Sequence, residues 1–246
     1  MTSGDLKLVA VTAHLDADKT KDYWGTWAED VETVAVQGVM GPVPAFYAGC
    51  IEAWKHYRPK LIACLHDDLA IHDRQWAARV RLAFAEDQDL VLAGFGGAKG
   101  LGEEWIYKRP YDPMSLVRKS FLSNMDQAEV HGARVKEVQE VACLDGFSLI
   151  GRAEFMLSGW HLFKGLGIVH HMYDGAFGAL ARRWGGKVKM PPVRCHHAGG
   201  LSAVGMKQFG DWADNNYGGD GQHAIWKQAH RAVWEEFADV LPFSVA

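Results

Sequence analysis

The stretch Lys60–Asp73, KLIACLHDDLAIHD, constrains the fold more than any other part of the chain. Its apolar run from Leu61 to Leu65 holds no Gly or Pro and ends abruptly in the sequence His-Asp-Asp. A short run of this kind is typical of a strand buried on both faces, as in a parallel sheet. Two adjacent carboxylates at the carboxyl end of such a strand lie where open α/β sheets bind their ligands.

The two carboxylates, Asp67 and Asp68, predict a metal site. Neighbouring negative charges repel each other, and a bound divalent cation relieves that repulsion. We therefore interpret this strand end as a metal site for a phosphorylated substrate. A solvated turn or a helix cap after a core strand is an equally good interpretation, because Asp is common in both.

Composition narrows the class of protein. The 246 residues are 48% hydrophobic and 23% charged, which is enough to bury a full core in one domain. A net charge of −4 gives no overall attraction to nucleic acid or anionic membrane. It disfavours DNA as a partner without excluding it, because a local basic groove is compatible with this net charge. No segment approaches the ~20 apolar residues of a membrane helix, and the N-terminus lacks a signal-peptide profile. The four cysteines form no C-x-x-C pair, so we expect reduced, mostly buried thiols and a cytoplasmic location.

Strand and helix patterns alternate along the chain, which predicts an α/β fold. We expect strands at 6–12, 31–36, 61–65, 90–93, 138–143 and 147–150, and a last one in KVKMPPVRCHHAGG (187–200). We expect helices from Pro44, over 73–84, near 113–131 and from Tyr173. The glycine cluster GFGGAKGLG lacks the pattern of a phosphate loop. Residues 201–246 have no strand signal and predict a loop followed by a helix.

A second group of polar residues lies in the last third of the chain. Asp174 is in the first turn of an expected amphipathic helix, which suits a helix cap and a catalytic base alike. His196 and His197 end the last expected strand. A histidine pair in such a place is more often hydrogen-bonded structure than a metal ligand.

Four segments, in this order, resemble a known family: LVAVTAHLD, AFYAGCIEAWKHYRPKLIACLHDDLAI, VACLDGFSLIGRAEF and MYDGAFGALARRWGGKVKMPPVRCHHAGG. The chain is similar to family-2-type glycosyltransferases of the GT-A fold, close to short members with an HDD motif. The resemblance covers roughly residues 6–200. It departs from the family pattern in two places, with His-Asp-Asp instead of Asp-x-Asp and Tyr173-Asp174 where the family has Glu-Asp.

The resemblance implies a fold. We expect a single GT-A domain with a Rossmann-like, mostly parallel central sheet flanked by helices and followed by a C-terminal helical tail. The core would span 1–200, with the nucleotide-sugar half at about 1–98 and the acceptor half at about 99–200. Residues 201–246 would be a loop and helix packed on that core.

The resemblance also implies an activity. We expect inverting transfer of a sugar from a nucleotide sugar, most simply a UDP-sugar, to an acceptor hydroxyl, with Mn²⁺ or Mg²⁺ stabilising the diphosphate leaving group. The implied metal ligands are Asp68 and His197, with His196 as the alternative, and the implied general base is Asp174, with Asp145 as second choice. Donor-binding residues would be Thr12, His14, His66 and Asp67, and acceptor-binding residues Gly96, Gly97 and Trp160.

For the acceptor, the resemblance implies a saccharide or, in some viruses, a hydroxylated base in DNA. Two features of the variable middle region bear on this choice. The basic cluster Lys108, Arg109, Arg118 and Lys119 lies where acceptor contacts are expected, although such clusters are usually solvated faces. Trp105 and Tyr107 are candidates for stacking on a sugar ring, with ordinary packing as the alternative.

Two other functions remain open at this point. A metal hydrolase could use imidazole and carboxylate ligands drawn from His170, His171, Asp174, His196, His197 and the Asp67-Asp68 pair. Against it, adjacent histidines in a strand point to opposite faces, so at most one of each pair reaches a shared ion. The altered motif also leaves open a non-catalytic module that binds carbohydrate or nucleotide.

Overall fold

The computed structural model describes residues 5–14, 17–27, 30–38, 41–102, 118–126, 132–198, 210–216 and 221–246. The strands are β1 (Leu8–His14), β2 (Glu32–Gln37), β3 (Leu61–His66), β4 (Leu69–Ile71), β5 (Leu90–Ala93), β6 (Gly96–Leu101), β7 (Arg118–Ser123), β8 (Gln139–Val141), β9 (Cys143–Leu144), β10 (Ser148–Arg152), β11 (Lys187–Met190), β12 (Cys195–His197) and β13 (Phe243–Ser244). The helices are α1 (Ala17–Trp24), α2 (Pro42–Tyr57), α3 (Trp76–Glu86), α4 (Ala153–Gly165), α5 (Tyr173–Arg183) and α7 (Gly221–Glu236). Over the described ranges, no helix combines the length and apolarity needed to cross a bilayer.

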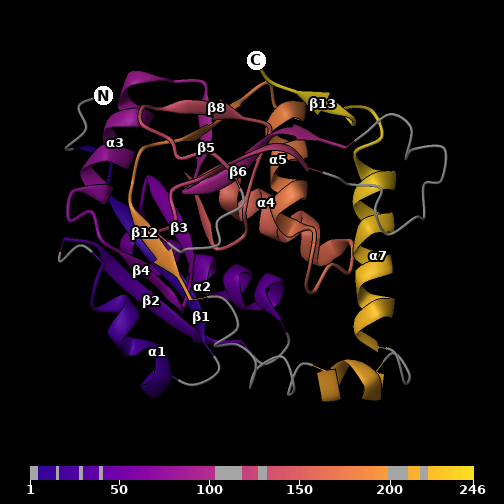
Figure 1. The fold of residues 1–246 in the computed structure, drawn as a ribbon. Coiled ribbons are helices and arrows are strands. Elements are labelled where there is room, and N and C mark those ends of the chain that lie inside the picture. The colour runs from indigo at the N-terminus through magenta and orange to yellow at the C-terminus, as the bar shows by residue number, and fades with distance from the viewer. Residues whose placement is uncertain are drawn as a thin grey trace.

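A seven-stranded sheet forms the centre of the molecule, in the order β2-β1-β3-β10-β5-β11-β8 (Figure 1). Strands β2, β1, β3, β5 and β11 run in one direction, whereas β10 and β8 run against their neighbours. This topology confirms the predicted α/β class with a mostly parallel central sheet.

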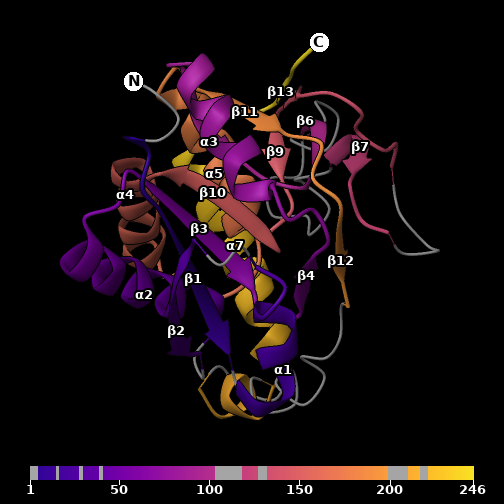
Figure 2. The same ribbon diagram turned by 90° about the vertical axis from the view of Figure 1, so that its left-hand side faces the viewer.

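Both faces of the sheet are buried at β1 and β3, which explains why the apolar runs of these two strands are continuous. Along β1, Val9 and Val11 belong to one hydrophobic cluster, and Leu8 and Ala10 belong to the other. Helices α2, α4 and α5 cover the first face, and α3 covers the second (Figure 2). Helix α2 can approach β1 closely because Gly49 has no side chain. A Cβ atom at this position would lie only 2.3 Å from Val11 Cγ1.

Two smaller sheets flank the central one. In the first, β4 pairs antiparallel with β12, and Leu69 lies opposite His197. Because Asp67 and Asp68 form the turn between β3 and β4, this pairing brings the end of β12 to the end of β3. The second small sheet contains β13, β6 and β7, with β9 also paired to β6.

The structure corrects three expectations about the elements and adds a strand, β6, in the glycine cluster. Residues 118–123, inside the helix expected near 113–131, form β7 instead. The single strand expected at 187–200 is two strands in separate sheets, because Pro191 and Pro192 lie between them and have no amide hydrogen to donate to a ladder. The glycine cluster contributes β6, and the C-terminal segment contributes the short strand β13.

The C-terminal helix α7 packs on the core. Ala229, Val233 and Phe237 are buried in the same hydrophobic cluster as residues of α4 and α5. In Figure 1, α7 runs along the side of the molecule next to these two helices. The expected division of the core into donor and acceptor halves stays a prediction.

Candidate metal centre and catalytic site

Three side chains meet at the carboxyl end of β3. His66 is the last residue of that strand, Asp68 precedes β4, and His197 ends β12. Nε2 of His197 lies 3.1 Å from Oδ1 of Asp68 and 3.3 Å from Nδ1 of His66. Ligand atoms of all three residues lie within 4.8 Å of one another, so they form a compact group, here called the His-Asp-His centre.

Asp68 is the residue of this centre that most needs a cation. The residue is 1% exposed, and neither carboxylate oxygen has a hydrogen-bond partner among the described residues, since His197 approaches without hydrogen-bond geometry. Burial raises the pKa of the carboxyl, but His197, His66 and the backbone together outweigh it and hold the pKa below its ordinary value. A buried, ionised and unsatisfied carboxylate is costly, and a bound metal ion removes that cost.

His66 is prepared to be a metal ligand. Burial, and then the neighbouring His197, lower the pKa of His66 to about 4, so the ring is neutral near pH 7. Its Nε2 atom lies 3.0 Å from the hydroxyl oxygen of Tyr173, the first residue of α5. With the proton on Nε2, the lone pair of Nδ1 faces the centre. Histidines that bind metals usually have their second ring nitrogen held in this way.

The structure shows which of the expected histidines lie together, and their roles stay predictions. His66, assigned to the nucleoside by its resemblance to the family, lies in the His-Asp-His centre with Asp68. A sequence signal for this existed, because His66 and Asp68 are two positions apart after a buried strand. Of the two candidates on β12, His197 belongs to the centre and His196 does not. Their side chains alternate between the two faces of a strand.

The two candidate bases flank the centre. Asp174 is in the first turn of α5, where its Oδ1 atom accepts the amide hydrogen of Gly175 at 2.7 Å. Asp145 is in the turn between β9 and β10, and its amide donates to the carbonyl of Gly96 at 2.8 Å. The negative charges of both aspartates act on His66 and tend to raise its pKa.

The segment just before α5 is strained and rich in histidine. His171 and Met172 have φ angles of 60° and 57°, the left-handed region that non-glycine residues seldom adopt. Burial lowers the pKa of His170 to about 3 and also lowers that of His171. These histidines lie near Asp174, but the described residues do not place them in the His-Asp-His centre.

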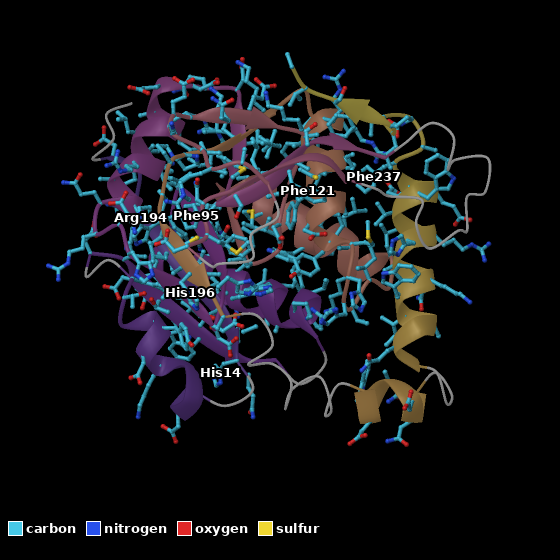
Figure 3. All side chains as sticks on the ribbon, viewed as in Figure 1. His14, Phe95, Phe121, Arg194, His196 and Phe237 are labelled. Atoms are coloured by element: carbon cyan, nitrogen blue, oxygen red, sulfur yellow. The ribbon has the colours of Figure 1, made fainter. Side chains whose placement is uncertain are left out.

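The predicted donor residues gather at the same edge of the sheet. Thr12 Oγ1 and His14 Nδ1, both on β1, are buried without a hydrogen-bond partner among the described residues. The ring of His14 lies 5.4 Å from that of Trp24, whose indole nitrogen donates to the carbonyl of Asp67 at 3.1 Å. Figure 3 shows His14 and His196 on the same side of the molecule.

The predicted acceptor residues are not supported in that role. Trp160 is fully buried against Phe46, Tyr173 and Phe177, so it offers no surface to a sugar ring. Gly96 and Gly97 are buried in β6, where a Cβ atom would lie 2.8 Å from Phe147 and 2.4 Å from the Cys143 carbonyl oxygen respectively. Both glycines therefore serve close packing.

The other residues named for the acceptor lie mostly beyond the described part of the chain. Trp105, Tyr107, Lys108 and Arg109 fall outside the described residues. Arg118 and Lys119 begin β7.

Comparison with protein-family models and with curated protein sequences finds no match. Glycosyltransferases are prominent among the similar solved structures. GalNAc-T7, solved with UDP, GalNAc and Mn²⁺, is 11% identical, with 95% of this chain and 57% of that chain covered and a TM-score of 0.48. A mannosyltransferase from Pyrobaculum calidifontis, in complex with GDP-Man and Mn²⁺, is 12% identical, with 95% and 70% covered and a TM-score of 0.43.

A glycosyltransferase involved in the glycosylation of the major capsid of PBCV-1 is 8% identical, with 63% of this chain and 66% of that chain covered and a TM-score of 0.35. The chain thus spans little more than half the length of GalNAc-T7 and about two thirds of the other two. These values describe a likeness of overall architecture only.

Proposed function

We propose that this protein is a metal-dependent glycosyltransferase that moves a sugar from a nucleotide-sugar donor to an acceptor hydroxyl. One observation carries the proposal. The carboxylate of Asp68 is buried and unsatisfied at the carboxyl end of a central strand, with His66 and His197 beside it. This is the edge at which open α/β sheets bind ligands, and Asp174 and Asp145 supply further carboxylates near it.

His66, Asp68 and His197 are the residues that would hold the metal ion. When bound, a divalent cation would neutralise the negative charge that grows on the diphosphate leaving group. Two imidazole nitrogens and one carboxylate favour Mn²⁺ over Mg²⁺, because Mg²⁺ prefers oxygen ligands and keeps its waters. Between the two ions expected from the sequence, we therefore propose Mn²⁺.

Asp174 is the proposed general base. The acceptor oxygen would bond to the anomeric carbon while the carbon–oxygen bond to the diphosphate breaks, with its electron pair leaving on the phosphate oxygen. The acceptor proton would pass to the carboxylate of Asp174. A single displacement of this kind inverts the anomeric centre and needs no covalent nucleophile. Asp145 is the second candidate for the same role.

Thr12 and His14 are proposed to bind the nucleoside of the donor. Their buried Oγ1 and Nδ1 atoms have no hydrogen-bond partner among the described residues, so a ligand that supplies one would be favoured. We propose a UDP-sugar as donor. The acceptor is proposed to be a saccharide hydroxyl, with a hydroxylated DNA base as the alternative that acceptor assays would separate.

A metal hydrolase is the second candidate function, because a centre with two histidines and one carboxylate also suits ions that activate water. The two functions differ in their products. A hydrolase would release phosphate from simple esters, whereas a glycosyltransferase would release a nucleoside diphosphate only as a sugar is transferred.

A thermal-shift panel of nucleotides and nucleotide sugars, with and without Mn²⁺, tests the proposal. A ligand that binds only the folded state raises Tm according to its concentration and affinity. We expect a shift with UDP or a UDP-sugar that requires Mn²⁺, and we expect Asp68→Asn to abolish it. Asp87→Asn is the matched control, since Asp87 pairs with Lys187 and Lys189 away from the centre.

A Tm shift with metal alone, together with phosphatase activity, would favour the hydrolase. Binding of UDP and Mn²⁺ by Asp68→Asn as tight as by the parent protein would remove the His-Asp-His centre from the proposal.

A further inference from the structure

The strand β4 has one edge paired with β12, and among the described residues no strand pairs with its other edge. An unpaired strand edge leaves backbone amides and carbonyls without partners. Here three side chains from residues 24–27, the last residue of α1 and the turn after it, take the place of a strand. This segment, called the edge clamp below, consists of Trp24, Thr26 and Trp27.

Each member of the edge clamp bonds a backbone group of the same strand edge. The indole nitrogen of Trp24 donates to the Asp67 carbonyl at 3.1 Å. That of Trp27 donates to the Leu69 carbonyl at 2.9 Å, and the hydroxyl of Thr26 accepts the amide hydrogen of Ile71 at 2.9 Å.

The opposite edge of β4 bonds the β12 segment. The amide of Ala198 donates to the carbonyl of Asp68 at 3.1 Å, and the amide of His72 donates to the carbonyl of Arg194 at 3.0 Å. Successive residues of a strand direct their backbone N–H and C=O groups to alternate edges. Here the groups on one edge bond to the backbone of the β12 segment, and those on the other edge bond to side chains.

The consequence for Asp68 is specific. The peptide group before its Cα atom is held by Trp24 through the Asp67 carbonyl, and the peptide group after it is held by Ala198. These two planes set the direction of the Asp68 side chain. The Ala198 amide also belongs to the peptide that follows His197, so one hydrogen bond ties the two ligands together.

We propose that Trp24, Thr26 and Trp27 are positioning residues for the metal centre: they hold the backbone of β4 so that Asp68 and His197 present their ligand atoms together. This role rests on the proposed function, because it presupposes that the His-Asp-His centre binds a cation. Groups that orient metal ligands without touching the ion commonly change metal affinity by 10- to 100-fold when removed.

The test measures Mn²⁺ affinity of the whole chain by titration calorimetry, without donor, acceptor or turnover. Trp24→Phe and Trp27→Phe remove the indole donors and keep an aromatic ring. We expect about a tenfold weaker Mn²⁺ affinity in each. Trp76→Phe is the matched control, because Trp76 is fully buried in the same hydrophobic cluster as Trp27 and its indole nitrogen has no hydrogen-bond partner among the described residues.

Thr26 offers a second pair of variants, one without the hydroxyl and one with it; the hydroxyl accepts from the Ile71 amide and also donates to the Tyr23 carbonyl at 2.6 Å. Thr26→Val keeps the shape and loses the hydroxyl, whereas Thr26→Ser keeps the hydroxyl. We expect Thr26→Val to weaken Mn²⁺ binding and Thr26→Ser to bind Mn²⁺ as tightly as the parent protein. Thermal unfolding in the presence of chelator identifies any variant that is not folded. If a tryptophan variant does not fold, the two Thr26 variants still test the proposal.

Three outcomes would overturn the proposal. Mn²⁺ affinities equal to that of the parent protein in Trp24→Phe, Trp27→Phe and Thr26→Val would remove the positioning role and leave the proposed function intact. An equal loss in Trp76→Phe would show that the effect is general core packing. Absence of Mn²⁺ binding by the parent protein itself would overturn the metal centre first, and the positioning role with it.

Discussion

The hydroxyl oxygen of Tyr173 lies 3.0 Å from Nε2 of His66, which joins the first residue of α5 to the last residue of β3. The proposed base, Asp174, follows Tyr173 directly. One contact therefore links the helix that holds the proposed base to a member of the His-Asp-His centre. Gly146 leaves room for it, because a Cβ atom at that position would lie 2.5 Å from the Tyr173 hydroxyl.

Removing this hydroxyl should weaken the metal centre. Tyr173→Phe keeps the buried ring and leaves His66 Nε2 without that partner, so we expect about tenfold weaker Mn²⁺ affinity and a loss of ~1 kcal/mol in unfolding free energy. Titration calorimetry and urea unfolding measure the two effects. Tyr57→Phe, at the end of α2, is the control and should leave Mn²⁺ affinity unchanged. Equal affinity in Tyr173→Phe and the parent protein would contradict a supporting role for Tyr173.

The donor atoms of the centre predict a preference among metals. We expect Mn²⁺ to bind at least tenfold more tightly than Mg²⁺, because two of the three proposed protein ligands are imidazoles. His197→Asp, which replaces one proposed nitrogen ligand by oxygen, should lower the ratio of the Mn²⁺ affinity to the Mg²⁺ affinity. Competition titrations with both ions measure it. A parent protein that binds Mg²⁺ as tightly as Mn²⁺ would show that the two histidines do not contact the ion.

The strands and helices around the centre could largely be predicted from the sequence. The run Leu61–Leu65 contains five consecutive buried residues because β3 is covered on both faces, and buried strands of this kind have a recognisable composition. Asp174 was placed in the first turn of a helix by the apolar periodicity that follows it, and α5 begins one residue before it.

The parts that could not be predicted depend on contacts between distant segments. His197 joins His66 and Asp68 because β4 pairs with β12, and no local pattern reveals that pairing. Whether Trp160 stacks on a sugar or packs in the core could not be decided from the sequence, because burial of an aromatic residue depends on its neighbours, here Phe46 and Phe177. The edge clamp was missed for the same reason, since its hydrogen bonds join residues more than 40 positions apart.

Buried histidines predict a loss of stability in mild acid. The pKa of His66 is lowered from 6.5 to about 4 and that of His170 from 6.5 to about 3, in both cases mainly by burial. Below pH 6.5 the unfolded chain binds protons at these residues and the folded chain does not, so the unfolding free energy falls as the pH drops toward 4. Above pH 6.5 both histidines are neutral in the folded and the unfolded chain, so the stability that their burial as neutral rings allows is then fully present.

Urea unfolding of the metal-free protein between pH 7.5 and about pH 4.5 measures this effect. His170→Gln removes one of the titrating groups, so its unfolding free energy should depend less steeply on pH. A stability that does not change over this range would contradict burial of neutral histidines at both positions.

The choice between Asp174 and Asp145 as general base can be decided by two matched amide variants. Asp174→Asn keeps an oxygen that can accept the Gly175 amide hydrogen, so the start of α5 should be preserved. With transfer as the assay, we expect kcat to fall by about 10²- to 10⁴-fold while the donor binds as tightly as before, because an amide cannot accept the proton of the acceptor hydroxyl. Asp145→Asn should cause a much smaller loss. If instead Asp145→Asn abolishes transfer and Asp174→Asn retains it, the base lies in the turn between β9 and β10, and Asp174 serves mainly to accept the Gly175 amide hydrogen in the first turn of α5.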